Sequence, residues 1–235
     1  MQLENITQSG SAEPKRRYDD ACGTAHALEL IGDRWTLLVL REMMLGARSF
    51  SDLRAALPGL SANVLTQRLA ELEERGLVLR KRLPPPASVQ VYEATEWGLE
   101  AEAIVQALGR WAARSPRHDP TLPLSAVSIL LSFRTMISAD RARGFDGRIG
   151  FRFGDETYLA RVKDERIEVG RDDLASADAI ITAAPTAIAA VVYGGAPLDS
   201  IAIEGDAGLA ERFLTLFVLP PKAGAESIEA GAPLA

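Results

Sequence analysis

The sequence predicts an α+β protein in two halves, the first mainly helical and the second organised around an antiparallel sheet. Apolar residues recur at helical spacing as far as Gly76, two β-prone runs then follow, and apolar residues alternate in the stretch after residue 148. The segment RSPRHDPTLP, residues 114–123, holds three prolines and no periodic apolar pattern. Such a segment is typical of a join between domains.

Composition narrows the class of protein. The 235 residues are 47% hydrophobic and 25% charged, which is ordinary for a globular chain. No apolar run approaches the about 18 residues of a membrane helix. The N-terminus has no apolar stretch like that of a signal peptide, so residues 1–17 are expected to be a disordered tail. Because the single cysteine excludes an intrachain disulfide, a cytoplasmic location is expected.

The charge is distributed unevenly along the chain. Its net value is −6, yet residues 13–118 hold 15 Lys and Arg against 14 Asp and Glu. Residues 119–235 hold 11 against 17, so the acidic surplus lies in the second half. The first half can therefore face a polyanion, because charges act mainly within a screening length of about 10 Å.

The first half begins with two helical segments that separate around Gly32-Asp33, and Asp33 is the expected N-cap of the second. Ser49, followed three residues later by Asp52, predicts a capping box at the start of another helix. A Pro-Gly pair at residues 58–59 stops that helix and turns the chain into the next one.

The helix expected from Ser61 to Gly76 has an unusual outer face. Leucines at i, i+4 and i+7 form its buried row, while Asn63, Thr66 and Gln67 are polar and uncharged. A short helix, a tight turn and a helix of this kind form a helix-turn-helix, whose second helix enters the DNA major groove. Asn and Gln can pair with adenine edges, and Ser or Thr with bases or phosphates. The predicted contacts on this helix are Ser61, Asn63, Thr66, Gln67 and, on its flank reaching a phosphate, Arg68.

A hairpin follows that helix. The runs LVLRKRL and VQVYEAT are β-prone and flank the rigid turn PPPAS. Its basic residues would hold the DNA backbone or minor groove, although a basic run taken alone is usually a solvated surface. Thr95 then caps a closing helix with a broad apolar stripe. The predicted hairpin contacts are Arg80, Lys81, Arg82, Gln90 and Tyr92.

The stretch ACGTAHALELIGDRWTLLVLREMMLGARSFSDLRAALPGLSANVLTQRLAELEERGLV resembles the HxlR family of bacterial winged helix-turn-helix regulators. The motifs GDRW, RSFSDL and LPGLS fall in order without gaps, and the likeness covers residues 18–115, the expected DNA-binding and dimerisation domain. The resemblance implies a homodimer that binds an inverted repeat and represses or activates nearby genes. The first and last helices would pair the subunits and cover the stripe with Leu108 and Trp111, for which core packing within one subunit is the alternative.

Cys22 matches a position where some members of that family carry a redox- or electrophile-sensing thiol. Gly23 follows it here, where the family usually has proline. A possible redox sensor at Cys22 therefore stands beside a second interpretation, since a lone cysteine is more often a small buried hydrophobe.

The second half, residues 124–220 after a linker at 116–123, predicts a helix, an antiparallel meander, and then two strand–helix pairs. This order, with ADAIITAAP and IAIEGDAGLAERFL, resembles the sterol-carrier-protein-2 (SCP2) fold. The resemblance implies an apolar tunnel and an apolar small-molecule effector, although the same residues could simply form a core. Residues 221–235 are expected to be a flexible tail. The candidate effector-binding residues are Leu130, Phe133, Met136, Val192, Phe213 and Phe217.

Enzymatic chemistry is not expected. The two histidines, His26 and His118, are far apart in sequence, and no GxSxG, P-loop or GxGxxG motif occurs. No metal or other cofactor is expected. The favoured function is a transcriptional regulator whose partners are double-stranded DNA, a second copy of itself and an apolar small molecule, with no membrane. The alternative is a lipid or acyl carrier whose helical half only dimerises.

Overall fold

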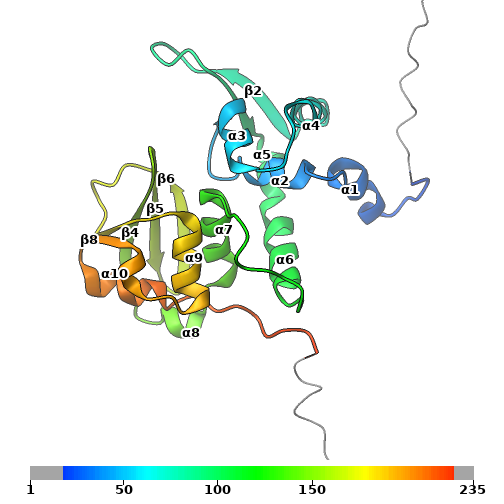
Figure 1. Ribbon diagram of the computed structural model, residues 1–235. Helices are drawn as coiled ribbons and strands as arrows, with labels where there is room; N and C mark the ends of the chain where they lie inside the picture. The colour runs from blue at the N-terminus through cyan, green and yellow to red at the C-terminus, as the bar shows by residue number, and fades with distance from the viewer. Residues whose placement is uncertain (1–17, 225–235) are drawn as a thin grey trace, which may run out of the picture.

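The computed structural model describes residues 18–224 and shows two units packed side by side (Figure 1). The N-terminal tail expected at 1–17 and most of the tail expected at 221–235 lie outside the described residues. The first unit contains α1 (Gly23–Ile31), α2 (Thr36–Arg41), β1 (Arg48–Ser49), α3 (Phe50–Ala56), α4 (Ala62–Glu74), β2 (Val78–Arg82), β3 (Gln90–Ala94), α5 (Glu96–Glu100) and α6 (Glu102–Ala113).

Local sequence signals set most of these boundaries. Ser49 and Asp52 form the predicted capping box at α3, and the Ser61 side chain accepts from the Val64 amide at the start of α4. The leucine row of α4 is buried as expected. Strand β1 was not predicted, because it has only two residues and is defined by its pairing with the distant strand β3. The three strands have the order β1-β3-β2.

Two expectations for this unit were wrong. Trp35, at φ 80°, occupies the N-cap of α2, and the carboxylate of Asp33 instead pairs with Arg68 at 2.9 Å and Arg75 at 3.6 Å. The single closing helix is two helices, α5 and α6, which meet at Ala101. The Asp33 carboxylate therefore ties the α1–α2 turn to α4.

The second unit is an α+β domain. Its five strands have the order β6-β5-β4-β7-β8, in which β4 and β7 are parallel and the other neighbours antiparallel. The meander and both strand–helix pairs match the prediction. The elements are α7 (Ala126–Met136), α8 (Ala139–Ala142), β4 (Gly147–Phe153), β5 (Glu156–Lys163), β6 (Arg166–Arg171), β7 (Ala179–Thr182), α9 (Pro185–Gly194), a 3-10 turn at Leu198–Ser200, β8 (Ala202–Gly205) and α10 (Ala207–Leu214).

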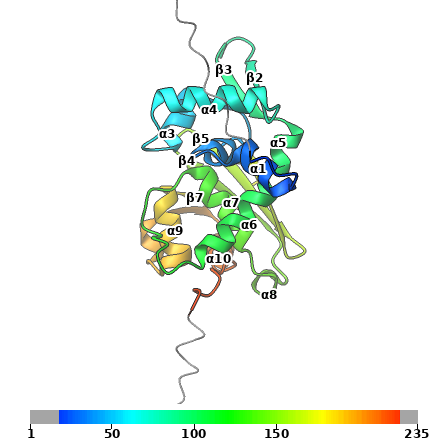
Figure 2. The same cartoon turned by 90° about the vertical axis from the view of Figure 1, so that its right-hand side faces the viewer.

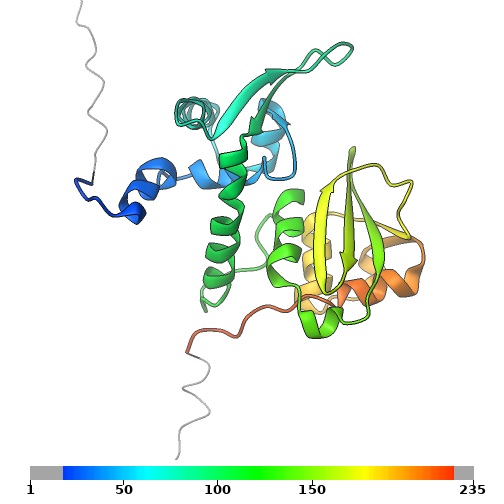
Figure 3. The same ribbon diagram turned by 180° about the vertical axis from the view of Figure 1, so that it is seen from behind.

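The helices of the second unit pack against its sheet (Figure 3), and aromatic rings fill the contact between them. The ring of Phe133 in α7 lies 5.8 Å from that of Phe151 in β4 and 5.6 Å from that of Phe213 in α10. All three side chains are fully buried. Helices α7 and α10 therefore share one apolar core against the sheet.

Helix α7 also connects the two units. Arg134 donates to Glu102 of α6 at 2.6 Å and to the carbonyl of Val169 in β6. The hydroxyl of Ser125, which caps α7, donates to the buried carboxylate of Glu42 at 2.9 Å.

No helix among residues 18–224 is long and apolar enough to cross a bilayer.

Candidate nucleic-acid interface and interdomain cleft

The outer face of α4 presents the predicted uncharged polar groups. Asn63, Thr66 and Gln67 are exposed, as is the capping residue Ser61. The Thr66 hydroxyl donates to the Ala62 carbonyl at 3.0 Å, and Gln67 donates to the Glu71 carboxylate at 3.2 Å. Both bonds stay within the helix, so these side chains remain accessible to a ligand.

Arg68 is different, and its predicted phosphate contact needs correction. Its side chain is 10% exposed and pairs with Asp33 at 2.9 Å and Glu71 at 3.1 Å. Because Arg68 lies three residues after Leu65 and directly before Leu69, it falls on the buried side of α4. Arg68 therefore helps to hold α4 in place and does not face DNA with its neighbours.

The β2–β3 hairpin carries the predicted basic residues on its surface. Arg80, Lys81 and Arg82 are all exposed. Arg80 lies 3.5 Å from Glu73, and Lys81 pairs with Glu93. Exposed pairs of this kind contribute about 0–1 kcal/mol, so a phosphate can replace either carboxylate.

Tyr92 does not join this surface, and its predicted DNA contact is also corrected. Strand β3 lies between β1 and β2, and Tyr92 faces Arg48 on one side and Arg80 on the other. The Tyr92 side chain is buried in the hydrophobic core, and its hydroxyl accepts from the Gln90 side-chain amide at 2.9 Å. Gln90 itself remains exposed at the hairpin end.

Helix α4 and the hairpin occupy the same side of the molecule. Figure 2 shows α4 running across the first unit with the hairpin beside it, on the side away from the second unit. In proteins with this geometry, the helix enters the major groove of DNA and the basic hairpin contacts the phosphate backbone.

A second surface of the first unit is apolar. Helix α1 buries a single side chain, Ala25, and projects from the body (Figures 1 and 3). Between α1, α2 and α6 lies a groove of about 430 Å³ that includes Leu28 and Leu108. Trp111 is 72% exposed on the same helix as Leu108. Apolar surface of this extent is typical of an interaction site.

Cys22 lies at the start of α1 and is exposed. Hydrogen bonds from the backbone amides of Thr24 and Ala25 lower the pKa of its thiol below the ordinary value. The alternative of a buried structural cysteine does not hold, because the side chain faces solvent.

The residues predicted to line an effector tunnel lie in the core of the second unit. Leu130 and Phe133 are fully buried, and Phe133 stacks on Phe217 at 4.3 Å between ring centroids. Phe213 meets Phe217 edge to face at 5.0 Å, Met136 is buried and Val192 is half-buried. These side chains pack on one another, as the core interpretation expects, and effector binding by them stays a prediction.

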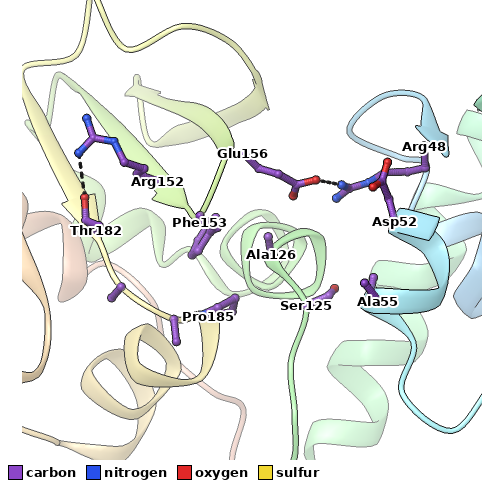
Figure 4. A pocket seen from close by; sticks show the side chains of 14 residues that line it. Arg48, Asp52, Ala55, Ser125, Ala126, Arg152, Phe153, Glu156, Thr182 and Pro185 are labelled. Carbon is purple, nitrogen blue, oxygen red and sulfur yellow. Dashed lines mark hydrogen bonds and ion pairs between the residues drawn. The ribbon is translucent and has the colours of Figure 1, made fainter. Parts of the chain in front are cut away.

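A cleft of about 460 Å³ that the sequence did not predict lies between the two units (Figure 4). At one end, the nearly buried Arg48 donates to the carboxylate of Glu156 and, at 2.8 Å, to the hydroxyl of Tyr158. Sequence patterns give no signal for this pair, because 108 residues separate Arg48 from Glu156.

No group of three or more His, Cys, Asp or Glu within residues 18–224 is placed to hold a metal ion. The expectation of a chain without enzymatic activity rests on its sequence motifs and on the class of protein to which it belongs.

The first unit has the architecture of a winged helix-turn-helix: α3 and α4 form the helix pair, and the β2–β3 hairpin is the wing. The HxlR-like helix-turn-helix family profile matches residues 30–119. The HTH-type transcriptional regulator YvaP of Bacillus subtilis is 35% identical over 86 residues, which span 37% of this chain and 80% of YvaP. The chain belongs to the HxlR family.

Further relatives carry the same description. The HTH-type transcriptional regulator YodB of Bacillus subtilis is 34% identical over 86 residues, 37% of this chain and 77% of YodB. The HTH-type transcriptional regulator sll1512 of Synechocystis is 34% identical over 103 residues, 44% of this chain and 76% of the relative. The family match ends at residue 119, before the second unit begins, so the SCP2-like assignment of that unit stays a prediction.

Proposed function

We propose that this protein is a homodimeric transcriptional regulator that reads an inverted-repeat operator with α4 and holds the DNA backbone with the β2–β3 hairpin. The observation that carries the proposal is the exposed, uncharged polar face of α4 beside the basic hairpin. Membership of the HxlR family, whose relatives are HTH-type transcriptional regulators, supports it.

Each side chain has a distinct task in this proposal. Asn63 and Gln67 meet base edges, because an amide can donate to and accept from an adenine at once. Ser61 and Thr66, in the first turns of α4, meet a phosphate where backbone amides favour an anion. Arg80 and its basic neighbours on the hairpin supply affinity without sequence preference.

A second copy of the chain would cover the apolar groove along α1 and α6. Leu28, Leu108 and Trp111 are exposed there, and α1 packs on little of its own subunit. Pairing through these helices would place two α4 helices at a fixed spacing, which an inverted repeat requires.

The second unit would bind a small molecule that changes operator affinity. Such a ligand must bind the DNA-competent and incompetent states with different affinity, because otherwise it shifts neither population. The alternative of a lipid or acyl carrier is less well supported, since a carrier has no need for the exposed α4 face or the basic hairpin.

Fluorescence anisotropy with DNA from upstream of this gene tests the proposal. Gln67→Ala should weaken operator binding by roughly 1–3 kcal/mol, the value of one bidentate base contact, and leave binding to scrambled DNA unchanged. Binding that is salt-sensitive and equal for both DNAs would contradict base readout by α4. No binding to any upstream DNA at low salt would favour the carrier.

A further inference from the structure

We propose that Glu71 is a positioning residue for base readout, because its carboxylate holds the Gln67 amide in the orientation that pairs with adenine. The inference rests on the proposed function, in which Gln67 meets a base edge. It adds a second side chain, on the largely buried flank of α4, on which the choice of base depends. Glu71 acts through Gln67 and needs no contact of its own with DNA.

Glu71 lies about one helical turn after Gln67 on α4. Residues four apart are neighbours on a helix surface, and the Gln67 amide nitrogen donates to Glu71 Oε1 at 3.2 Å. Gln67 is exposed, whereas the Glu71 side chain is only 15% exposed. Glu71 therefore binds the exposed amide from the protein side and leaves the rest of that amide open to a ligand.

The acceptor chemistry of Glu71 decides which way the Gln67 amide points. A carboxylate accepts hydrogen bonds and does not donate them, so the amide nitrogen, and not the amide oxygen, is held against Glu71. The nitrogen carries a second N–H, which stays open to a ligand together with the oxygen. Adenine presents an acceptor at N7 beside a donor at N6 in the major groove, and an amide matches this order in one orientation. Turned over, the amide would place its oxygen against the carboxylate and present the reverse order to the base.

A network of ion pairs fixes the position of the Glu71 carboxylate. Arg68 lies 3.1 Å from Oε1 and Arg75 lies 3.6 Å from Oε2, so each oxygen has a cationic partner. Both arginines also pair with Asp33 in the turn between α1 and α2, at 2.9 Å and 3.6 Å. Arg75 donates in addition to the carbonyl of Leu30 near the end of α1. The carboxylate is therefore anchored to a different part of the chain, and its orientation does not depend on α4 alone.

The other uncharged side chains of the α4 face have no such anchor. Thr66 donates to the carbonyl of Ala62 in its own helix, and Asn63 makes no side-chain hydrogen bond within residues 18–224. A side chain that is fixed before binding loses less conformational freedom when it meets its partner. The base pair that Gln67 meets should therefore be read more strictly than the one that Asn63 meets.

The hydrogen bond can be tested without DNA by NMR of the ¹⁵N-labelled full chain. The side-chain amide signals of Gln67 are those that disappear in Gln67→Ala. Glu71→Ala should shift these signals, because it removes the acceptor. Glu74→Ala removes a carboxylate from an exposed position of the same helix and should leave them in place. Unchanged Gln67 signals in Glu71→Ala would overturn the proposal, whatever DNA the protein binds.

The consequence for readout is tested by fluorescence anisotropy with the upstream operator and its single base-pair variants. The base pair read by Gln67 is the one whose replacement weakens binding by wild type but not by Gln67→Ala. Wild type should prefer A·T there by roughly 5- to 150-fold, the discrimination of one bidentate contact. Glu71→Ala should lose most of this preference, and the double variant should lose no more than Gln67→Ala alone, because the two residues act as a unit.

Two further variants separate positioning from charge and from folding. Glu71→Ala and Glu74→Ala each remove one negative charge from α4, so a general gain in DNA affinity appears in both, whereas the A·T preference should fall in Glu71→Ala alone. Glu71→Gln keeps the shape of the side chain and one acceptor oxygen, and should retain an intermediate preference. Circular dichroism and urea denaturation check that each variant is folded.

The outcomes distinguish this proposal from the proposed function. An A·T preference equal to that of wild type in both Glu71 variants would overturn the role of Glu71 and leave the regulator supported. Equal weakening of operator and scrambled DNA by Glu71→Ala would also overturn it, since that is the effect of a purely structural residue. A wild type that prefers no base pair at any position would contradict base readout by α4, and both proposals would fall together.

Discussion

The exposed polar face of α4 in the first unit and the junction between the two units use polar side chains in opposite ways. On α4, Thr66 bonds to Ala62 and Gln67 to Glu71, four residues along the same helix, and the side chains stay exposed. At the junction, Arg48 is nearly buried and bonds to Glu156 and Tyr158, 108 and 110 residues away. A polar group kept near its own helix is available to a partner, whereas one paired across the fold holds two units together.

The largest expected effect lies at the junction. Arg48→Met should lower the free energy of unfolding by about 2 kcal/mol, because it removes the hydrogen bonds that Arg48 donates to Glu156 and Tyr158, while Arg171 still pairs with the Glu156 carboxylate. Urea denaturation measures this difference. Arg161→Met, at an exposed position in β5, is the matched control and should change stability by less than about 0.5 kcal/mol. A similar small loss for both variants would show that the junction contributes little.

Tyr158 should make the same junction sensitive to alkaline pH. Burial raises the pKa of Tyr158 to about 12, from an ordinary 10.0, so the fold favours the neutral phenol. The stability that Tyr158 contributes is therefore complete below pH 10 and is lost as the pH rises towards 12. Denaturation of wild type and Tyr158→Phe at several pH values measures it. The wild type should lose more stability than the variant over this range, and parallel losses would contradict the assignment.

Substitutions in the exposed basic hairpin should change DNA affinity and its salt dependence, with a smaller effect on stability than substitutions at the junction. Replacing both Arg80 and Arg82 by Gln should reduce the slope of log affinity against log salt by about 2 and weaken operator and scrambled DNA equally. Anisotropy at a series of salt concentrations gives the slope. Stability should stay within about 0.5 kcal/mol of wild type, because both side chains are exposed. A loss confined to the operator would mean that the hairpin reads sequence.

The smallest expected effect concerns Cys22. Because backbone amides lower the pKa of its thiol, more thiolate is present at a given pH than for an ordinary cysteine. Iodoacetamide should therefore react at a lower pH with Cys22 than with a cysteine-containing peptide, as mass spectrometry can follow. Cys22→Ser should remove the reaction without a measurable change in stability. An ordinary pH profile would remove the support for a redox sensor at this position.

Much of the fold follows from signals between residues that are close in the chain. The capping box of Ser49 and Asp52, the cap of α4 by Ser61 and the alternation in the meander each involve near neighbours. The exposed face with Asn63 and Gln67 follows from the leucine row on the other side of the same helix. These features could be predicted because helix and strand periodicity are properties of a short segment.

Tertiary structure alone decided the roles of the remaining polar residues. Arg68 and Tyr92 were predicted to be further DNA contacts, but Arg68 is paired with the Asp33 carboxylate and Tyr92 is packed in the hydrophobic core. No role was predicted for Arg48. In the structure it links the two units, because its hydrogen-bond partners Glu156 and Tyr158 belong to the second unit. The sequence by itself indicated which side chains are candidates for DNA contact. The packing of distant segments decided which of them remain on the surface, because burial depends on neighbours that sequence spacing does not encode.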